Sequence, residues 1–204
     1  EAAYVLNESA GMYEFSGEPF NDAYRYVDWL LTVPLLVVEL VLVLGLPKSE
    51  SGKMIAKLAI AAALMIVLGY PGEVSENTQL FGARGLWGTL STIPFVYILY
   101  ILFTELGSTI QQQSGRVATL LSNARLLLLA TWGFYPIAYM IPMFASGYPT
   151  ETPGAVVALQ VGYTISDVAA KAGYGVLIYN IAKAKSEEEG YDVNEMVQPV
   201  GAEA

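Results

Sequence analysis

The sequence predicts an all-α membrane protein built as a single helical bundle. Of its 204 residues, 54% are hydrophobic and only 14% are charged, whereas a soluble domain carries about 25% charged residues. The mean hydropathy is +0.47. Long apolar stretches between short polar segments are typical of helices that cross a bilayer, because in lipid each segment must satisfy its own backbone hydrogen bonds.

One lysine lies where a charge is costly. Lys171 falls near the middle of an otherwise apolar stretch, residues 156–182, which as a helix would be about 40 Å long against a bilayer core of about 30 Å. A charge at that depth costs at least about 2.5–3.5 kcal/mol, so it indicates a functional site. Asp167, one helical turn earlier, is the expected partner. The alternative is a structural ion pair that only joins helices.

Five stretches are predicted to span the membrane. Before them, residues 1–22 are polar and acidic, and the alternation around Tyr4–Leu6 and Met12–Phe15 predicts a short hairpin. We expect the transmembrane bundle to cover residues 23–185 and an acidic, disordered tail to cover residues 186–204. The predicted spans are residues 24–46, 55–70, 86–106, 120–144 and 156–182.

The loops predict the orientation of the chain, because successive connections alternate sides. One side is basic, and cytoplasmic loops carry an excess of Lys and Arg. The N-terminal segment is therefore expected outside and the C-terminus inside. On the acidic outer side, Glu73 is expected to be solvated. The residues of the basic side are Lys48, Lys53, Lys57, Arg116, Arg125, Lys183 and Lys185.

This orientation places a row of ionisable residues across the membrane. Arg25 and Asp28 lie toward the outer side of the first span, and Glu39 lies about 16 Å closer to the cytoplasm than Asp28. Asp167 lies on the outer side of Lys171. Two cations and two anions sum to zero, as a buried set should. Glu39 is left without a partner and is expected to be protonated and neutral. The row predicts a proton path.

Composition excludes several other classes of chemistry. The chain has no cysteine and no histidine, which excludes disulfides, thiolate metal sites and catalysis by an imidazole of this chain. The net charge of −9 argues against nucleic acid as a partner, because such partners need a basic footprint.

Several segments resemble microbial (type 1) rhodopsins. RYVDWLLTVPLLVVEL (Arg25–Leu40) and ISDVAAK (Ile165–Lys171) look like the third and seventh helices of that family. YPGEV after the second span and WGFYPIAY (Trp132–Tyr139) also match, and the pattern is most similar to the proton-pumping proteorhodopsin and xanthorhodopsin group. The resemblance covers about residues 20–185. It implies a seven-helix rhodopsin bundle of which this chain supplies helices three to seven, without the first two.

The resemblance also implies roles for the ionisable row. Lys171 would carry all-trans retinal as a protonated Schiff base. Asp28 would be the proton acceptor and counterion, and Asp167 the second counterion. Glu39 would be the cytoplasmic proton donor, with the alternative that it only bonds a polar group on a missing helix. Arg25 would gate the outward path.

A retinal pocket is implied as well. Its aromatic members could instead be ordinary packing residues, but beside an intramembrane lysine they favour a ligand pocket. Thr32 would lie beside the Schiff base. The other residues of the implied pocket are Trp29, Leu36, Met65, Gly69, Trp87, Gly88, Trp132, Tyr135, Pro136 and Tyr163.

Gly88 departs from most of the family, which generally places a bulky aromatic after the residue matching Trp87. Xanthorhodopsin-like pumps have glycine there and bind a carotenoid antenna. A missing side chain would open a window beside the retinal ring. The alternative is that Gly88 only lets helices pack closely.

The sequence thus predicts a light-driven outward proton pump, a transporter rather than an enzyme, with a carotenoid antenna near Gly88 as a further expectation. Asp28, Thr32 and Glu39 argue against chloride and sodium pumps of the family. The alternatives are a photosensory rhodopsin that signals to a membrane partner, although sensors generally lack the donor carboxylate, and a non-photochemical scaffold. Expected partners are lipid, two further helices of the same protein and copies of the chain in a trimer or pentamer, in a bacterial inner membrane.

Overall fold

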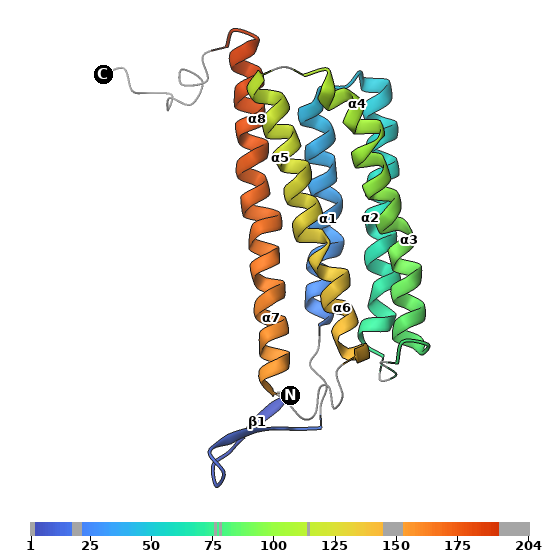
Figure 1. Ribbon diagram of the computed structural model, residues 1–204, viewed down its shortest axis with the longest axis vertical. Coiled ribbons are helices and arrows are strands. Elements are labelled where there is room, and N and C mark those ends of the chain that lie inside the picture. Colours follow the sequence, from blue (N-terminus) through green and yellow to red (C-terminus); the bar gives the residue numbers. More distant parts are fainter. Residues whose placement is uncertain are drawn as a thin grey trace, which may run out of the picture.

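The computed structural model describes residues 3–17, 22–75, 77, 79–113, 115–144 and 153–191. The described helices lie side by side as one bundle (Figure 1). The end of the predicted tail, beyond residue 191, lies outside the described residues. The helices are α1 (Ala23–Leu44), α2 (Lys48–Glu73), α3 (Ala83–Phe103), α4 (Glu105–Gln111), α5 (Gly115–Trp132), α6 (Phe134–Phe144), α7 (Pro153–Val168), the π-helical turn η1 (Ala169–Gly173) and α8 (Tyr174–Glu188).

Four helical stretches among the described residues are long and apolar enough to cross a membrane: Ala23–Leu44, Lys48–Glu73, Ala83–Gln111 and Gly115–Phe144. The fifth predicted span is present as one continuous helical segment, but η1 divides it into α7 of 16 residues and α8 of 15 residues. Each piece is shorter than the about 20 residues that a span needs. Together, α7, η1 and α8 run the full height of the bundle (Figure 1).

The second span is longer than predicted at both ends. We expected residues 55–70, but α2 begins at Lys48 and ends at Glu73. Pro47 precedes the first turn with a φ of −52°, which suits the start of a helix, and Glu50 lies in the first turn, where a negative charge is favourable. Polar residues therefore extend this helix beyond its apolar part.

The core of the bundle lies along α1, which packs against both α2 and α8. Buried positions recur along α1 every three or four residues, which is the period of one helical face. The opposite face exposes large apolar side chains such as Val27, Leu31 and Leu35, as expected of a surface in contact with lipid. The buried apolar residues of α1 are Tyr26, Trp29, Val33, Leu36, Val37, Leu40, Val41 and Leu44.

The predicted hairpin is present before α1. Strand β1 (Tyr4–Asn7) pairs antiparallel with β2 (Met12–Phe15). The Asn7 side chain accepts hydrogen bonds from the backbone N–H of Ser9 and Ala10, and Gly11 closes the turn at a φ of 66°, in the left-handed region that favours glycine. The hairpin lies at the end of the bundle where α1 and α7 begin, and α8 ends at the other (Figure 1).

A lysine from α8 holds the end of α1 at the opposite end of the bundle. Lys185 Nζ donates to the carbonyl oxygens of Val43 and Leu44, each at 2.9 Å. These carbonyls belong to the last turn of α1, which lacks helical partners for them. Gly45 ends the helix in the left-handed conformation, and its N–H donates to Leu42 O at 3.2 Å. The first and last helices are therefore joined by a charge-assisted cap.

Replacing this lysine tests the cap. We expect Lys185→Met to lower the free energy of unfolding by about 1–2 kcal/mol, because two carbonyls lose a charged donor. Thermal unfolding in detergent measures the effect. Lys183→Met is the matched control, since Lys183 Nζ only pairs at 3.9 Å with the half-exposed Glu187, and it should change little. An equal loss in both variants would show that the cap contributes nothing specific.

Candidate functional site

Lys171 lies in a π-helical turn, not in the regular α-helix that the sequence predicted. In η1 the backbone N–H of Tyr174 reaches back to the carbonyl of Ala169, five residues earlier. The small neighbours Ala170 and Gly173 leave room for the wider backbone of this turn. Such turns are frequent at functional sites.

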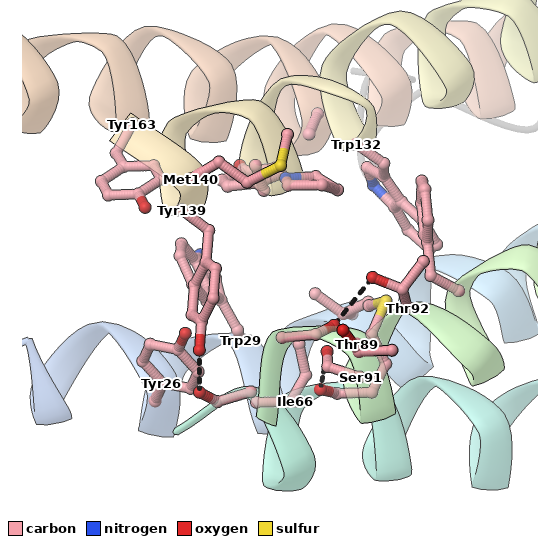
Figure 2. A pocket seen from close by; sticks show the side chains of 18 of the residues that line it. Tyr26, Trp29, Ile66, Thr89, Ser91, Thr92, Trp132, Tyr139, Met140 and Tyr163 are labelled. Atoms are coloured by element: carbon pink, nitrogen blue, oxygen red, sulfur yellow. Dashed lines mark hydrogen bonds between the residues drawn. The ribbon is translucent and has the colours of Figure 1, made fainter. Parts of the chain in front are cut away.

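A pocket opens beside this turn, between α1, α2, α3, α5, α6 and α7 (Figure 2). Its empty volume, including its mouth, is about 1120 Å³. In Figure 2, Trp132 lies on the side opposite Tyr139 and Tyr163. Most of the walls are apolar or aromatic, the usual lining of a small-molecule site. The predicted pocket residues that line it are Trp29, Leu36, Met65, Gly69, Gly88, Trp132, Tyr135, Pro136 and Tyr163, together with Asp167 and Lys171.

Trp87, Thr32 and Glu39 are not among the residues that line this pocket. The Cβ of Trp87 lies 2.9 Å from where a Cβ on Gly72 would lie, and its place beside a bound retinal stays a prediction. The Thr32 hydroxyl donates to Asp28 O of its own helix at 2.8 Å. Glu39 has an exposed side chain in the described part of the chain, and its role as proton donor stays a prediction.

Gly88 has a packing reason to be glycine. A Cβ at this position would lie 2.6 Å from Cε1 of the Tyr139 ring, closer than any ordinary contact. The Tyr139 ring thus occupies the space that a side chain on Gly88 would need. Gly88 still lines the pocket, so close packing and an opening in the wall are compatible.

Lys171 lies between two carboxylates. Its Nζ forms an ion pair and a hydrogen bond with Asp28 Oδ2, and it lies 3.8 Å from Asp167 Oδ1. The Asp28 side chain is 45% exposed and that of Asp167 only 17%. The predicted pairing with Asp167 is present, but Asp28 on α1 is the closer partner.

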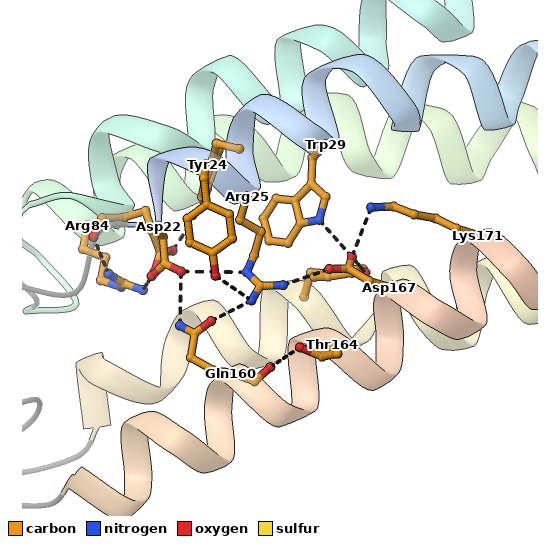
Figure 3. Close-up of polar contacts among 12 residues, drawn as sticks. Asp22, Tyr24, Arg25, Trp29, Arg84, Gln160, Thr164, Asp167 and Lys171 are labelled. Atoms are coloured by element: carbon orange, nitrogen blue, oxygen red, sulfur yellow. Dashed lines mark hydrogen bonds and ion pairs between the residues drawn. The ribbon is translucent and has the colours of Figure 1, made fainter. Parts of the chain in front are cut away.

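Asp167 is held by three donors from two other helices (Figure 3). Arg25 Nη1 donates to its Oδ2 at 2.8 Å. Trp29 Nε1 and the Tyr135 hydroxyl donate to its Oδ1 at 2.9 and 2.6 Å. Hydrogen bonds to a charged acceptor are short and strong, so this arrangement stabilises the charged carboxylate and fixes its position.

Arg25 continues the polar chain toward the end of the bundle where α1 begins. It is 7% exposed, and its Nη2 donates to Gln160 Oε1 at 2.7 Å. Gln160 Nε2 in turn donates to Asp22 Oδ1 at 3.1 Å, and Arg25 Nε lies 3.8 Å from the same oxygen. Figure 3 shows Arg25 between Asp22, Gln160 and Asp167. The structure therefore connects Lys171 to this end through side chains of α1 and α7.

A second ion pair lies on the same side of the molecule. Arg84 Nη2 pairs with Glu73 Oε1 at 3.0 Å, with side chains only 3% and 7% exposed, so the prediction that Glu73 is solvated is wrong. Tyr26 donates to Glu73 Oε2 at 3.3 Å, and the Arg84 guanidinium lies 4.4 Å from the centre of the Tyr139 ring. The only sequence signal for this pair was opposite charge at the two ends of one short connection, residues 73 and 84.

The family model described as "Bacteriorhodopsin-like protein" matches residues 2–185. The chain belongs to this family. The predicted resemblance to microbial rhodopsins is thereby confirmed, and the apolar helices described above are those of a multi-pass membrane protein. This bacteriorhodopsin-like chain is also similar to curated relatives and to solved structures.

Among the relatives, it is 30% identical over 166 residues to green-light absorbing proteorhodopsin of Gamma-proteobacterium EBAC31A08, covering 80% of this chain and 62% of that protein. It is 31% identical over 179 residues to bacteriorhodopsin of Halobacterium salinarum (strain ATCC 700922 / JCM 11081 / NRC-1), covering 85% of this chain and 62% of that protein. The chain thus spans about three fifths of the length of these curated relatives.

Two solved structures share the fold over most of the chain. The first is xanthorhodopsin, described as a light-driven ion pump with dual chromophore. It has 77% identity and a TM-score of 0.83, over 93% of this chain and 73% of that one. The second is a thermophilic rhodopsin, with 50% identity and a TM-score of 0.81, over 93% of this chain and 72% of that one.

Asp22 makes the stability of the bundle pH-dependent. Burial, followed by the nearby Glu73 carboxylate, raises the pKa of Asp22 from 3.8 to about 6 against the lowering effect of Gln160 and Arg25. Because the folded pKa is the higher one, ionised Asp22 destabilises the fold as pH rises from about 4 through 6. We expect Asp22→Asn to be more stable than the wild type at pH 7, by about 1–2 kcal/mol after allowing for partial exposure, and equally stable at pH 4.

Thermal unfolding at several pH values measures this difference. Glu105→Gln serves as a control, because Glu105 forms an exposed pair with Lys57 at 3.3 Å, and it should show no comparable trend. A stability difference for Asp22→Asn that stays constant from pH 4 to pH 7 would show that Asp22 carries no such cost.

Proposed function

We propose that this protein is a light-driven pump that moves protons out of the cell, with retinal attached covalently to Lys171. The observation that carries the proposal is the position of one amine, in the wall of an aromatic pocket and between two carboxylates of unequal surroundings. A structural ion pair would explain one carboxylate but neither the second nor the pocket.

The pocket fits retinal by the chemistry of its walls. Trp29, Trp132, Tyr135 and Pro136 present flat, apolar surfaces that suit a polyene, and Lys171 lies among them. Retinal bound to the Lys171 nitrogen as a protonated Schiff base would supply the absorption of light and a change of shape. The side chains of the protein then determine where the proton goes.

Asp28 is the better proton acceptor of the two carboxylates. Asp167 already accepts hydrogen bonds from Arg25, Trp29 and Tyr135, which occupy both of its oxygens. For the Asp28 carboxylate, the partner found in the described part of the chain is Lys171 itself. Once the proton leaves the lysine nitrogen, Asp28 loses that partner and accepts the proton more readily. We therefore assign Asp28 as acceptor and Asp167 as the permanent counterion.

The direction of transport follows from where the other groups lie. The chain from Asp167 through Arg25 and Gln160 to Asp22 leads to the end of the bundle that carries the hairpin, which the loop charges predict to be outside. Glu39 lies on α1 toward the other end and would return a proton to Lys171 from the cytoplasm. In this proposal Thr32 supports the Asp28 turn through its bond to Asp28 O.

A photosensory role is the alternative. Two features support a pump over a sensor: the carboxyl of Glu39 on the predicted cytoplasmic side, and similarity at 77% identity to a structure described as a light-driven ion pump. The oligomeric state and the lipid partners remain predictions from the sequence.

We also propose a carotenoid antenna near Gly88. The dual chromophore named for the xanthorhodopsin structure and the place of Gly88 in the pocket wall support it. Thr92 and Met143 line the same pocket, and the lack of a side chain on Gly88 would thin the wall there, except where the Tyr139 ring lies against it.

Substitution of Asp28 tests the pump. In the full-length protein with all-trans retinal, Asp28→Asn should shift the visible band to the red, because the positive charge at the lysine nitrogen loses a stabilising anion. Light-driven acidification of a cell suspension should fall by about 100-fold or more, as expected when a proton acceptor is removed. Lys171→Ala should form no pigment, and Glu105→Gln should keep both colour and acidification. Full acidification by Asp28→Asn would transfer the acceptor role to another group.

Substitution of Gly88 tests the antenna. With a hydroxylated carotenoid added, the excitation spectrum for retinal fluorescence should show a carotenoid-shaped band that Gly88→Trp removes. Because even a Cβ at Gly88 would displace Tyr139, Tyr139→Phe is the necessary control: it perturbs the same ring without filling the opening and should keep the band. A wild-type spectrum without a carotenoid contribution would rule out the antenna.

A further inference from the structure

Tyr174 is a buried residue that neither the sequence analysis nor the assigned roles include. It directly follows the π-helical turn that carries Lys171, and its side chain is fully buried at 0% exposure. Its hydroxyl donates to the backbone carbonyl of Leu36 on α1 at 3.0 Å. The described residues thus contain a direct bond between the lysine segment and the helix that carries both Asp28 and Glu39.

The position of this bond along α1 is informative. Leu36 lies between Asp28 and Glu39, three residues before Glu39, which is about 4.5 Å along a helix axis. Tyr174 lies three residues after Lys171, which places it along the bundle toward the end at which Glu39 lies. The bond therefore lies at the level between the lysine and its predicted proton donor.

Packing alone does not require this hydroxyl. A phenylalanine would fill the same volume, and the Leu36 carbonyl can accept from its own helix at residue 40. Two features make an extra support useful here. Pro34 in α1 has no N–H to donate to the Leu30 carbonyl, which weakens the helix in the turn before Leu36, and η1 is wider than an α-helix. Both irregular segments are fixed relative to each other where Tyr174 bonds Leu36.

We propose that Tyr174 is a positioning residue for the return of the proton to Lys171. Its bond to the Leu36 carbonyl sets the distance between η1 and the Glu39 turn of α1. In the step that it supports, the O–H bond of the Glu39 carboxyl breaks and an N–H bond forms at the lysine nitrogen. This inference rests on the proposed pump.

The test is Tyr174→Phe in the full-length protein with retinal in lipid, followed by flash spectroscopy. The visible band and the departure of the proton from the lysine nitrogen should stay as in the wild type, because Asp28, Asp167 and the pocket keep their contacts. The return of the proton should slow by about threefold to tenfold, the effect of one lost hydrogen bond. Glu39→Gln, which lacks the proposed donor, should slow the same step and make it depend on pH, and adding Tyr174→Phe to it should slow the step no further.

Thr131→Val is the matched control. The Thr131 hydroxyl is also buried and also donates to a backbone carbonyl, that of Leu127 at 2.8 Å, but within its own helix α5. This variant loses a bond of the same kind in a helix that packs against η1, without separating η1 from α1. Its proton return should match the wild type.

A second measurement needs no retinal. In the retinal-free protein, Tyr174→Phe should speed amide hydrogen exchange in α1 around Leu36 and in η1 by about threefold to tenfold, whereas Thr131→Val should not. If exchange speeds up but proton return is unchanged or faster, the bond is only structural and the proposal is wrong. If neither changes, the bond has no role. If the wild type itself forms no pigment or does not pump, the proposed function fails, and the exchange result still reports on the bond.

Discussion

An ammonium group inside an apolar bundle needs an anion beside it, and the arrangement around Lys171 follows from that requirement. Asp28 and Asp167 approach the same nitrogen from α1 and α7, and each brings different neighbours. Asp167 is already committed to Arg25, Trp29 and Tyr135. The result is one fixed anion and one that depends on the lysine, an asymmetry on which directional proton transfer can be built.

Much of this site could be predicted from the sequence because several of its residues lie one helical turn apart within a single helix. A lysine in an apolar stretch is conspicuous, Asp167 stands one helical turn away, and Asp28 follows Arg25 at helical spacing. Once Lys171 had been predicted as a functional residue, the aromatic residues near Pro136 could also be assigned to a pocket beside it. These features need only the helical period and the cost of a buried charge.

The rest depends on how distant helices meet. Glu73 lies next to Arg84 only because α2 extends beyond its apolar part and a short connection turns back on it. The Tyr174 hydroxyl donates to the carbonyl of Leu36, which lies 138 residues earlier in the sequence. The π-helical turn at Lys171 rotates the side chains around it relative to a regular α-helix. The α-helical period alone therefore does not predict which of them face the pocket. Trp87 is a further case, since its neighbour Gly88 lines the pocket whereas Trp87 is not among the lining residues.

Tyr139 joins the pocket to the ion pair between Arg84 and Glu73. Its ring fills the space next to Gly88, its hydroxyl donates to Arg84 O at 3.1 Å, and its face lies against the Arg84 guanidinium. A change that moves this ring to enlarge or reshape the pocket must also disturb the partner of Glu73. Substitutions that reshape this wall would therefore alter the thermal stability of the protein at the same time, and compensating changes belong at Glu73 and Arg84 rather than around the pocket.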